Sequence, residues 1–187
     1  LKKKDVQIDR RKLIHILTGN FVFVWWLFES ELPMLIFFTI PFMILLFLSA
    51  PDSKIEPLRR SIIGEASQKG HSYGLFFYAV SITVLVAFFF DHFIAASIGV
   101  VAMSYGDGFG SIVGKRFGKR KVRGKKTLEG SIGVFCATFI MALVVLSFYS
   151  LLIDQGLYFS AFTGNLHMVL VALIAGLFTA VVELYSP

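Results

Sequence analysis

The positively charged residues of this chain are confined to three short segments, and long apolar segments separate them. All 18 lysines and arginines lie in residues 2–12, 54–69 and 115–126. The apolar segments cover residues 13–28, 32–50, 73–90, 93–112, 131–153 and 166–184. At 1.5 Å per helical residue, each is about long enough to cross a hydrocarbon core of roughly 30 Å. The sequence therefore predicts an all-α, polytopic membrane protein with six transmembrane helices.

Six helices in series place every basic segment on one side of the membrane. The charged residues of the opposite loops are all acidic: Glu29, Glu31, Asp91 and Asp154. Because loops rich in lysine and arginine stay in the cytoplasm, the N-terminus and any active site on the basic side are predicted to be cytoplasmic. We expect an integral protein of a prokaryotic cell membrane or of the endoplasmic reticulum. It would form one transmembrane catalytic domain over residues 1–187, with cytoplasmic loops at about 51–72 and 113–130.

The composition narrows the choice of partners. Hydrophobic residues make up 56% of the chain, and the longest polar stretch, residues 52–72, is too short for a separate soluble domain. The net charge of +6 lies at the membrane surface and not along a face that grips nucleic acid. We therefore expect contacts with the lipid bilayer and with phosphorylated ligands, and no nucleic-acid partner.

Small residues recur at every fourth position along the fourth predicted span and the loop that follows it: Ala102, Gly106, Gly110, Gly114 and Gly118. On a helix, this spacing forms one stripe, called here the glycine stripe, which lets another backbone approach closely. Packing against a neighbouring helix explains the stripe as well as contact with a ligand does. It also offers a face through which copies of the chain can associate.

A polar stripe runs beside the glycines and consists of Asp107, Ser111 and Lys115. Polar groups at membrane depth are costly and usually line a cavity instead of facing lipid. The loop that follows is strongly basic, and Asp107 and Glu129 bracket it. An anchor that fixes membrane topology explains the density of charge, but it does not explain the interleaved glycines or the two acids.

These residue types suit phosphoryl transfer, which depends on positioning and on neutralisation of charge. Asp107 and Glu129 offer the hard oxygen ligands that Mg²⁺ prefers. Lys125 and Lys126 supply positive charge, and Thr127 is expected to cap the fifth span. The residues predict a nucleotide triphosphate bound with Mg²⁺, in which Asp107, Lys126 and Glu129 are catalytic and the two acids hold the metal. Glu129 has an alternative role as a partner of the helix dipole.

A second group of candidates lies where the first span begins and consists of Arg11, Lys12 and His15. Arg11 and Lys12 would clamp a phosphate near the lipid headgroups, and His15 would relay a proton as a catalytic residue. The alternative is an interfacial anchor with a snorkelling arginine. Glu183, near the end of the last span, either completes the cavity or reaches the interface, and the sequence does not separate these two roles.

Three motifs follow one another along the chain. They are Arg11-Lys12-Leu13-Ile14-His15, then Gly106-Asp107 with Gly110 and Gly114, then Lys125-Lys126-Thr127-Leu128-Glu129-Gly130-Ser131. Together they resemble the CTP-dependent lipid kinases, the family of dolichol kinase, phytol kinase and fungal-type diacylglycerol kinase. The resemblance implies a polytopic helical fold, usually with a further helix after the sixth. It also implies transfer of the γ-phosphate of CTP to the hydroxyl of an isoprenoid alcohol or of diacylglycerol at the cytoplasmic face.

The resemblance assigns activity to Arg11, Lys12, Asp107, Gly114 and residues 125–129. With the stripes described above, it gives a set of residues expected to bind the nucleotide phosphates: Arg11, Lys12, Gly106, Gly110, Ser111, Gly114, Lys115, Lys125 and Thr127.

Two other functions stay open. Phosphatidate cytidylyltransferases are related and share an aspartate, glycine and Lys-Thr-x-Glu-Gly pattern, so the alternative function is a CDP-lipid synthase. Arg11 and Lys12 with His15 match the kinase branch, which favours the kinase. A membrane transporter is the third hypothesis. It is disfavoured because the polar residues gather at one face of the membrane and do not continue across it.

Overall fold

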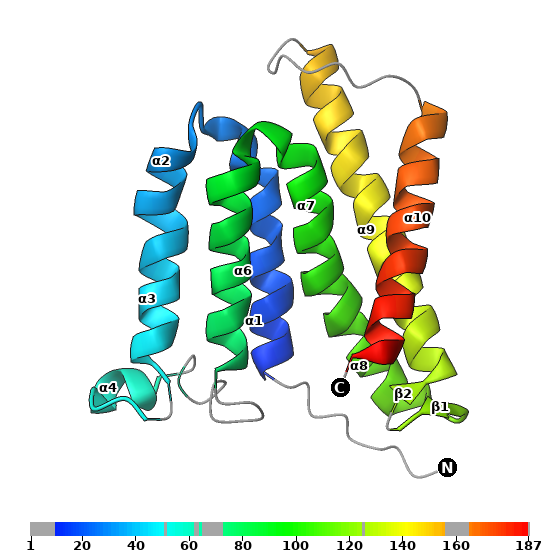
Figure 1. Ribbon diagram of the computed structural model, residues 1–187, viewed down its shortest axis with the longest axis horizontal. Coiled ribbons are helices and arrows are strands. Elements are labelled where there is room, and N and C mark those ends of the chain that lie inside the picture. The colour runs from blue at the N-terminus through cyan, green and yellow to red at the C-terminus, as the bar shows by residue number, and fades with distance from the viewer. Residues whose placement is uncertain are drawn as a thin grey trace. The chain divides into compact units, whose positions relative to one another are not determined.

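A computed structural model describes residues 10–50, 52–61, 64, 73–124, 126–155 and 165–186, and leaves the side chains of residues 10, 11, 165 and 166 undescribed. The chain divides into two compact units. We call the described residues up to Ala96 the N-terminal unit and those from Ser97 onward the C-terminal unit. Both units consist almost entirely of helices (Figure 1). The prediction of a mainly helical protein is therefore confirmed.

The N-terminal unit begins with α1 (Arg10–Gly19), followed by two short 3-10 helices, η1 (Asn20–Phe23) and η2 (Trp25–Leu27). One longer helix then combines α2 (Glu31–Met34), the π-helical turn η3 (Leu35–Thr39) and α3 (Ile40–Leu48). The described residues that follow form α4 (Glu56–Arg59), α6 (Gly74–Phe89) and the 3-10 turn η4 (Phe90–His92). Pro41 of α3 has no amide hydrogen to donate to the preceding turn. The π-helical turn ends just before this proline.

Within the N-terminal unit, α6 packs against both α3 and α1. Leu46 of α3 and Leu75 and Ala79 of α6 are buried together, and Ile14 of α1 lies against them. Other large apolar side chains of the same helices point outward. Phe37 of η3, for example, is 72% exposed. Helices that are apolar on their outer as well as their inner faces are suited to a hydrocarbon surrounding.

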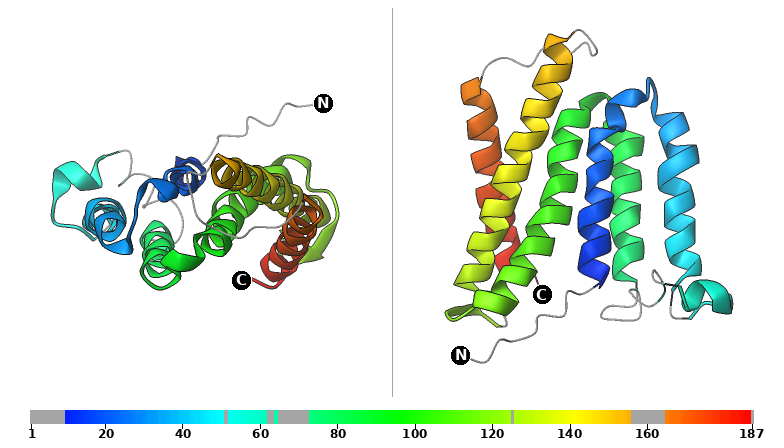
Figure 2. Two further views of the ribbon diagram at one scale, coloured as in Figure 1. Left: turned by 90° about the horizontal axis from the view of Figure 1, so that it is seen from above. Right: turned by 180° about the vertical axis from the view of Figure 1, so that it is seen from behind.

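The C-terminal unit contains the second half of the chain. Helix α7 (Phe93–Val101) leads from one unit into the other and continues through the π-helical turn η5 (Ala102–Gly106) into α8 (Asp107–Phe117). Two short strands follow, β1 (Lys121–Arg123) and β2 (Lys126–Thr127), and then the long helices α9 (Leu128–Asp154) and α10 (Asn165–Tyr185). Helix α9 packs against α8 and α10 and buries Val134, Ala142 and Val145 completely or almost completely. Figure 2 shows α9 and α10 side by side from above and from behind.

Four helical stretches of the described chain are long and apolar enough to cross a membrane. They are Glu31–Leu48, Gly74–Phe117, Leu128–Asp154 and His167–Tyr185. The third and fourth predicted spans both fall in Gly74–Phe117, where η4 separates α6 from α7. The first predicted span contains only a shorter apolar helix, Lys12–Phe23. The helices thus fit a membrane protein, while the number of six spans stays a prediction.

The basic loop differs from the all-α prediction, because it folds into a small antiparallel hairpin. Lys121 pairs with Thr127 and Arg123 with Lys126, with an irregularity between the two pairs. Gly124 lies in the turn with a φ of 55°, a conformation that a residue with a Cβ rarely adopts. In addition, α8 continues to Phe117 and α9 begins at Leu128, so that only the middle of the predicted 113–130 loop lies outside the helices.

Candidate active site

The glycine stripe is the contact between α8 and α9. A Cβ atom on Gly114 would lie 3.3 Å from the hydroxyl oxygen of Thr127 and 3.4 Å from the Cα of Gly130. A Cβ on Gly110 would collide with the side chain of Val134. Helix packing is therefore one established use of the stripe. The face that was expected to join copies of the chain is occupied by α9 of the same chain.

Thr127 caps α9 as predicted. Its hydroxyl oxygen accepts a hydrogen bond from the backbone N–H of Gly130 at 3.1 Å, and its own backbone is extended. This is the standard geometry of an N-cap residue, which satisfies one of the amide groups left without an intrahelical partner. The Gly130 backbone lies against Gly114 of α8. The cap and the glycine contact thus fix the start of α9 against α8.

Glu129 binds the backbone of the segment that leads from α8 into the hairpin. Its carboxylate accepts backbone hydrogen bonds from Lys119 at 3.0 Å and from Arg120 at 3.2 and 3.3 Å. Both donors follow the C-terminal end of α8, whereas Asp107 is the first residue of that helix. The 11 residues of α8 span about 16 Å. The structure therefore does not bring Glu129 to Asp107, and it does not support these two residues as ligands of one metal ion.

The role of Glu129 can be tested directly. Glu129→Gln keeps an oxygen that accepts one backbone hydrogen bond, so turnover should stay within about tenfold of the unchanged protein. Glu129→Ala should increase hydrogen exchange at the amides of Lys119 and Arg120, measured by mass spectrometry, because both would lose their acceptor. A loss of more than about a hundredfold in Glu129→Gln, with normal exchange at these amides, would instead indicate a role in the chemistry.

Asp107 lines a groove that it shares with the end of α10. The groove has a volume of about 480 Å³, and its other hydrogen-bonding side chains are those of Thr179, Glu183 and Ser186. Ala102 and Met103 of the π-helical turn η5 form part of the apolar wall. π-Helical turns are rare and are frequently found at functional sites. The polar residues thus gather at one end of an otherwise mainly apolar groove.

Lys126 joins the hairpin to this groove. Its ammonium group forms an ion pair with the carboxylate of Glu183, and it also lies 3.3 Å from the hydroxyl oxygen of Ser186. Both members of the ion pair are partly buried, with 27% of the Lys126 and 20% of the Glu183 side chain exposed. The guanidinium of Arg123 lies over the ring of Tyr185, 4.7 Å from its centroid. The hairpin is therefore attached to the C-terminal end of α10 at two points.

Glu183 is the residue whose role the sequence left undecided, and the structure places it in the groove. The signal that pointed to it was an acidic residue in the last turn of an apolar span, a position at which ionisable groups are costly and usually paired. Its partner, Lys126, is far away in the sequence. The fold brings the two together because α9 and α10 pack side by side.

The remaining predicted residues are distributed over both units. Ser111 and Lys115 lie on α8, one and two turns beyond Asp107, and Lys115 is exposed. Lys12 and His15 are buried in the N-terminal unit, and the His15 ring stacks on the Tyr78 ring with centroids 4.1 Å apart. Lys125 and the side chain of Arg11 lie outside the described residues. Gly106 is buried, and a Cβ there would lie 2.6 Å from the hydroxyl oxygen of Thr138.

The groove has two carboxylates in its lining, one of which is paired with Lys126. Asp107 and Glu183 both supply carboxylate oxygens to its lining. Groups of three or more histidine, cysteine, aspartate or glutamate residues that could hold a metal ion do not occur in the described part of the chain. Mg²⁺ is usually held by one or two carboxylates together with water and substrate phosphates, and not by a complete protein cage. The two carboxylates of the groove fit that pattern.

Comparison with known proteins identifies the family. The cytidylyltransferase family matches residues 4–185 of the chain. The phytol kinase of Synechocystis sp. is 33% identical over 147 residues, which cover 74% of this chain and 58% of that protein. The phytol kinase 1 of Arabidopsis thaliana is 30% identical over 159 residues, or 80% of this chain and 52% of that protein. The dolichol kinase of Saccharomyces cerevisiae is 40% identical over 52 residues, or 27% of this chain and 10% of that protein.

The chain spans about half the length of the curated phytol kinases that it matches. No solved structure matches it. The family match covers the glycine stripe, the hairpin and all residues of the groove except Ser186. The chain therefore belongs to the cytidylyltransferase family, and its predicted resemblance to the phytol and dolichol kinases is confirmed.

Proposed function

We propose that this chain forms the catalytic part of a lipid kinase that transfers the γ-phosphate of CTP to the hydroxyl of an isoprenoid alcohol of the phytol or polyprenol class. Diacylglycerol is the other acceptor that the family resemblance implies. The observation that carries the proposal is the groove in which the half-buried carboxylate of Asp107 lies with the Lys126–Glu183 ion pair. The similarity to phytol kinases supports the choice of acceptor.

In the proposed mechanism, Lys126 changes partners. The ammonium group neutralises Glu183 in the structure, and a triphosphate in the groove would offer it a partner of higher charge. Lys126 would then contact a phosphate oxygen and leave the Glu183 carboxylate on the same wall as Asp107. Asp107 and Glu183 would hold Mg²⁺, which supplies neutralisation of the charge that spreads over the transferred phosphoryl group. The hairpin, attached to α10 through Arg123, would keep Lys126 at the edge of the groove.

The transfer breaks the bond between the γ-phosphorus and the oxygen that bridges it to the β-phosphate, and it forms a bond from the γ-phosphorus to the lipid oxygen. CDP leaves, and the proton of the lipid hydroxyl is released to water. The chain's contribution is the positioning of charge, because phosphoryl transfer requires little covalent participation by the protein. We further propose that the site lies at the cytoplasmic face, as the sorting of the basic segments predicts.

The donor and the reaction type are tested together with two labelled nucleotides. The full-length protein in lipid nanodiscs is incubated with CTP that carries label at either the α- or the γ-phosphate, and with dolichol, phytol, geranylgeraniol or diacylglycerol. A kinase places only the γ-label on the lipid and releases CDP. Transfer of the α-label to a lipid phosphate acceptor, with release of pyrophosphate, would instead identify a CDP-lipid synthase. Parallel reactions with ATP and GTP test the choice of nucleotide.

A further inference from the structure

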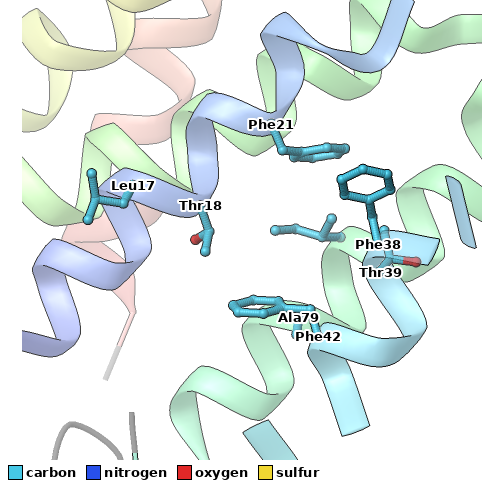
Figure 3. Close-up of a pocket in the computed structure, with 8 residues that line it drawn as sticks. Leu17, Thr18, Phe21, Phe38, Thr39, Phe42 and Ala79 are labelled. Carbon is cyan, nitrogen blue, oxygen red and sulfur yellow. The ribbon is translucent and has the colours of Figure 1, made fainter. Parts of the chain in front are cut away.

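The N-terminal unit contains a cavity that shares no lining residue with the groove. Its volume is about 220 Å³, and it lies between α1, the helix formed by η3 and α3, and α6 (Figure 3). Leu17 and Phe21 form one side, Phe38 another and Ala79 part of a third. The other lining residues are apolar as well, with the exception of two threonines. An apolar chain, and not a nucleotide, is the kind of ligand that suits these walls.

One of the two threonines has a hydroxyl for which the fold supplies no acceptor. Thr39 is only 6% exposed, and its hydroxyl oxygen has no hydrogen-bond partner among the described residues. By contrast, Thr83 of α6 donates to the carbonyl of Ala79, one turn earlier, at 2.9 Å. Thr39 ends the π-helical turn η3. A buried hydroxyl without a partner is costly. Because Thr39 lines the cavity, a ligand bound there would meet this wall.

The second threonine connects the cavity to a polar layer. The hydroxyl of Thr18 donates to the carbonyl of Ile14 at 2.8 Å and lies 3.3 Å from the hydroxyl of Tyr78. Tyr78 in turn donates to the carbonyl of His15 at 3.2 Å, and its ring stacks on the His15 ring. The cavity thus has hydroxyl and imidazole groups beside one edge and apolar walls elsewhere. This is the pattern expected for a ligand with one small polar end and a long hydrocarbon chain.

We propose that this cavity holds the part of the acceptor's hydrocarbon chain nearest to its hydroxyl group. This inference rests on the proposed function, because it takes the acceptor to be an isoprenoid alcohol.

Photolabelling tests the inference without requiring turnover. The full-length protein in nanodiscs is labelled with a long-chain isoprenoid alcohol that carries a diazirine near its hydroxyl end, and the labelled residues are found by mass spectrometry. We expect label on α1 and η3. Leu17→Trp places a large ring at the mouth of the cavity, where Leu17 is 59% exposed. It should reduce this labelling, and raise the KM for the alcohol, by about tenfold. The KM for CTP should not change.

Leu13→Trp is the matched control. Leu13 lies one turn before Leu17 on α1 and is 47% exposed, but it does not line the cavity. Labelling that both variants reduce equally, or that Leu17→Trp does not reduce, would overturn the inference. The same conclusion follows if a diazirine phosphatidylcholine labels these residues and the alcohol does not displace it. A second variant, Leu17→Cys in a Cys136→Ser background, introduces a smaller side chain and so avoids the misfolding that a tryptophan could cause. If the alcohol occupies the cavity, it should protect the new thiol from modification by a maleimide.

The two proposals fail in different ways. If α1 and η3 are labelled as expected but no alcohol is phosphorylated, the cavity is a binding site for isoprenoid alcohols and the proposed kinase activity is wrong. If an alcohol is phosphorylated but the label lies on other residues, the kinase activity is supported and the assignment of this cavity is wrong.

Discussion

Replacing Asp107 with asparagine is expected to lower kcat by about 10²–10³-fold and to leave the protein folded. The amide has nearly the same shape as the carboxylate, so the groove keeps its form. It has no negative charge with which to hold a metal ion against the phosphates of a nucleotide. The measurement is the rate of γ-label transfer from CTP to the alcohol at saturating concentrations of both, with thermal unfolding of each variant recorded in the same nanodiscs.

Asp154→Asn provides the control for this prediction. Asp154 is an exposed aspartate at the C-terminal end of α9, whereas the hairpin precedes the N-terminal end of that helix. It does not line the groove. Its replacement should change kcat by less than about twofold, because an exposed charge far from the reaction contributes little. If the Asp107→Asn variant unfolds at the same temperature as the unchanged protein and retains near-normal activity, Asp107 is not part of the chemistry, and the groove loses its main support as the active site.

The parts of the site that follow from local patterns were predictable from the sequence. A threonine at the start of an apolar stretch predicts a helix cap, and Thr127 is one. Glycines at every fourth position predict close approach of another backbone, and Gly110 and Gly114 face α9. In both cases the relevant partners lie on the same helix or on the next one in the chain, so the spacing alone carries the information.

The hairpin and the role of Glu129 were not predictable in the same way. The strands are very short, and three of their five residues are basic, so they are too short and too polar for a strand pattern to indicate them. A glutamate in the first turn of a helix suits a metal ion, the helix dipole or a backbone amide equally well. In the structure Glu129 accepts hydrogen bonds from the amides of Lys119 and Arg120. The position of these amides depends on the length of α8, which continues five residues beyond the predicted end of its span.

The pairing of Glu183 with Lys126 depends on tertiary packing and leaves no trace in local spacing. The pattern showed that an acidic residue lay near the end of the last span, but it did not show which basic residue would meet it. Packing of α10 against α9 settles that question, because it brings the last turn of α10 next to the strand that precedes α9. The groove is therefore a product of helix packing, although each of its charged residues could be singled out beforehand.

Exchanging the charges of this ion pair is expected to separate its contribution to folding from its contribution to catalysis. Lys126→Glu alone places two carboxylates together, which should lower the unfolding temperature and lower kcat/KM for CTP by at least about a hundredfold. Combining it with Glu183→Lys restores an ion pair of opposite polarity. The double variant should recover most of the unfolding temperature but not the activity, because the phosphates of CTP would now meet a carboxylate at position 126.

The exposed ion pair between Glu56 and Arg60 of the N-terminal unit supplies the comparison, since its exchange should change neither quantity appreciably. If the Lys126 and Glu183 double variant regains both stability and activity, the ion pair serves only to attach the hairpin to α10. Lys126 would then have no contact with the nucleotide. If stability returns while kcat/KM stays low, the ammonium group is needed at the hairpin and not merely somewhere in the groove. That result is the one expected of a lysine that exchanges Glu183 for a phosphate oxygen.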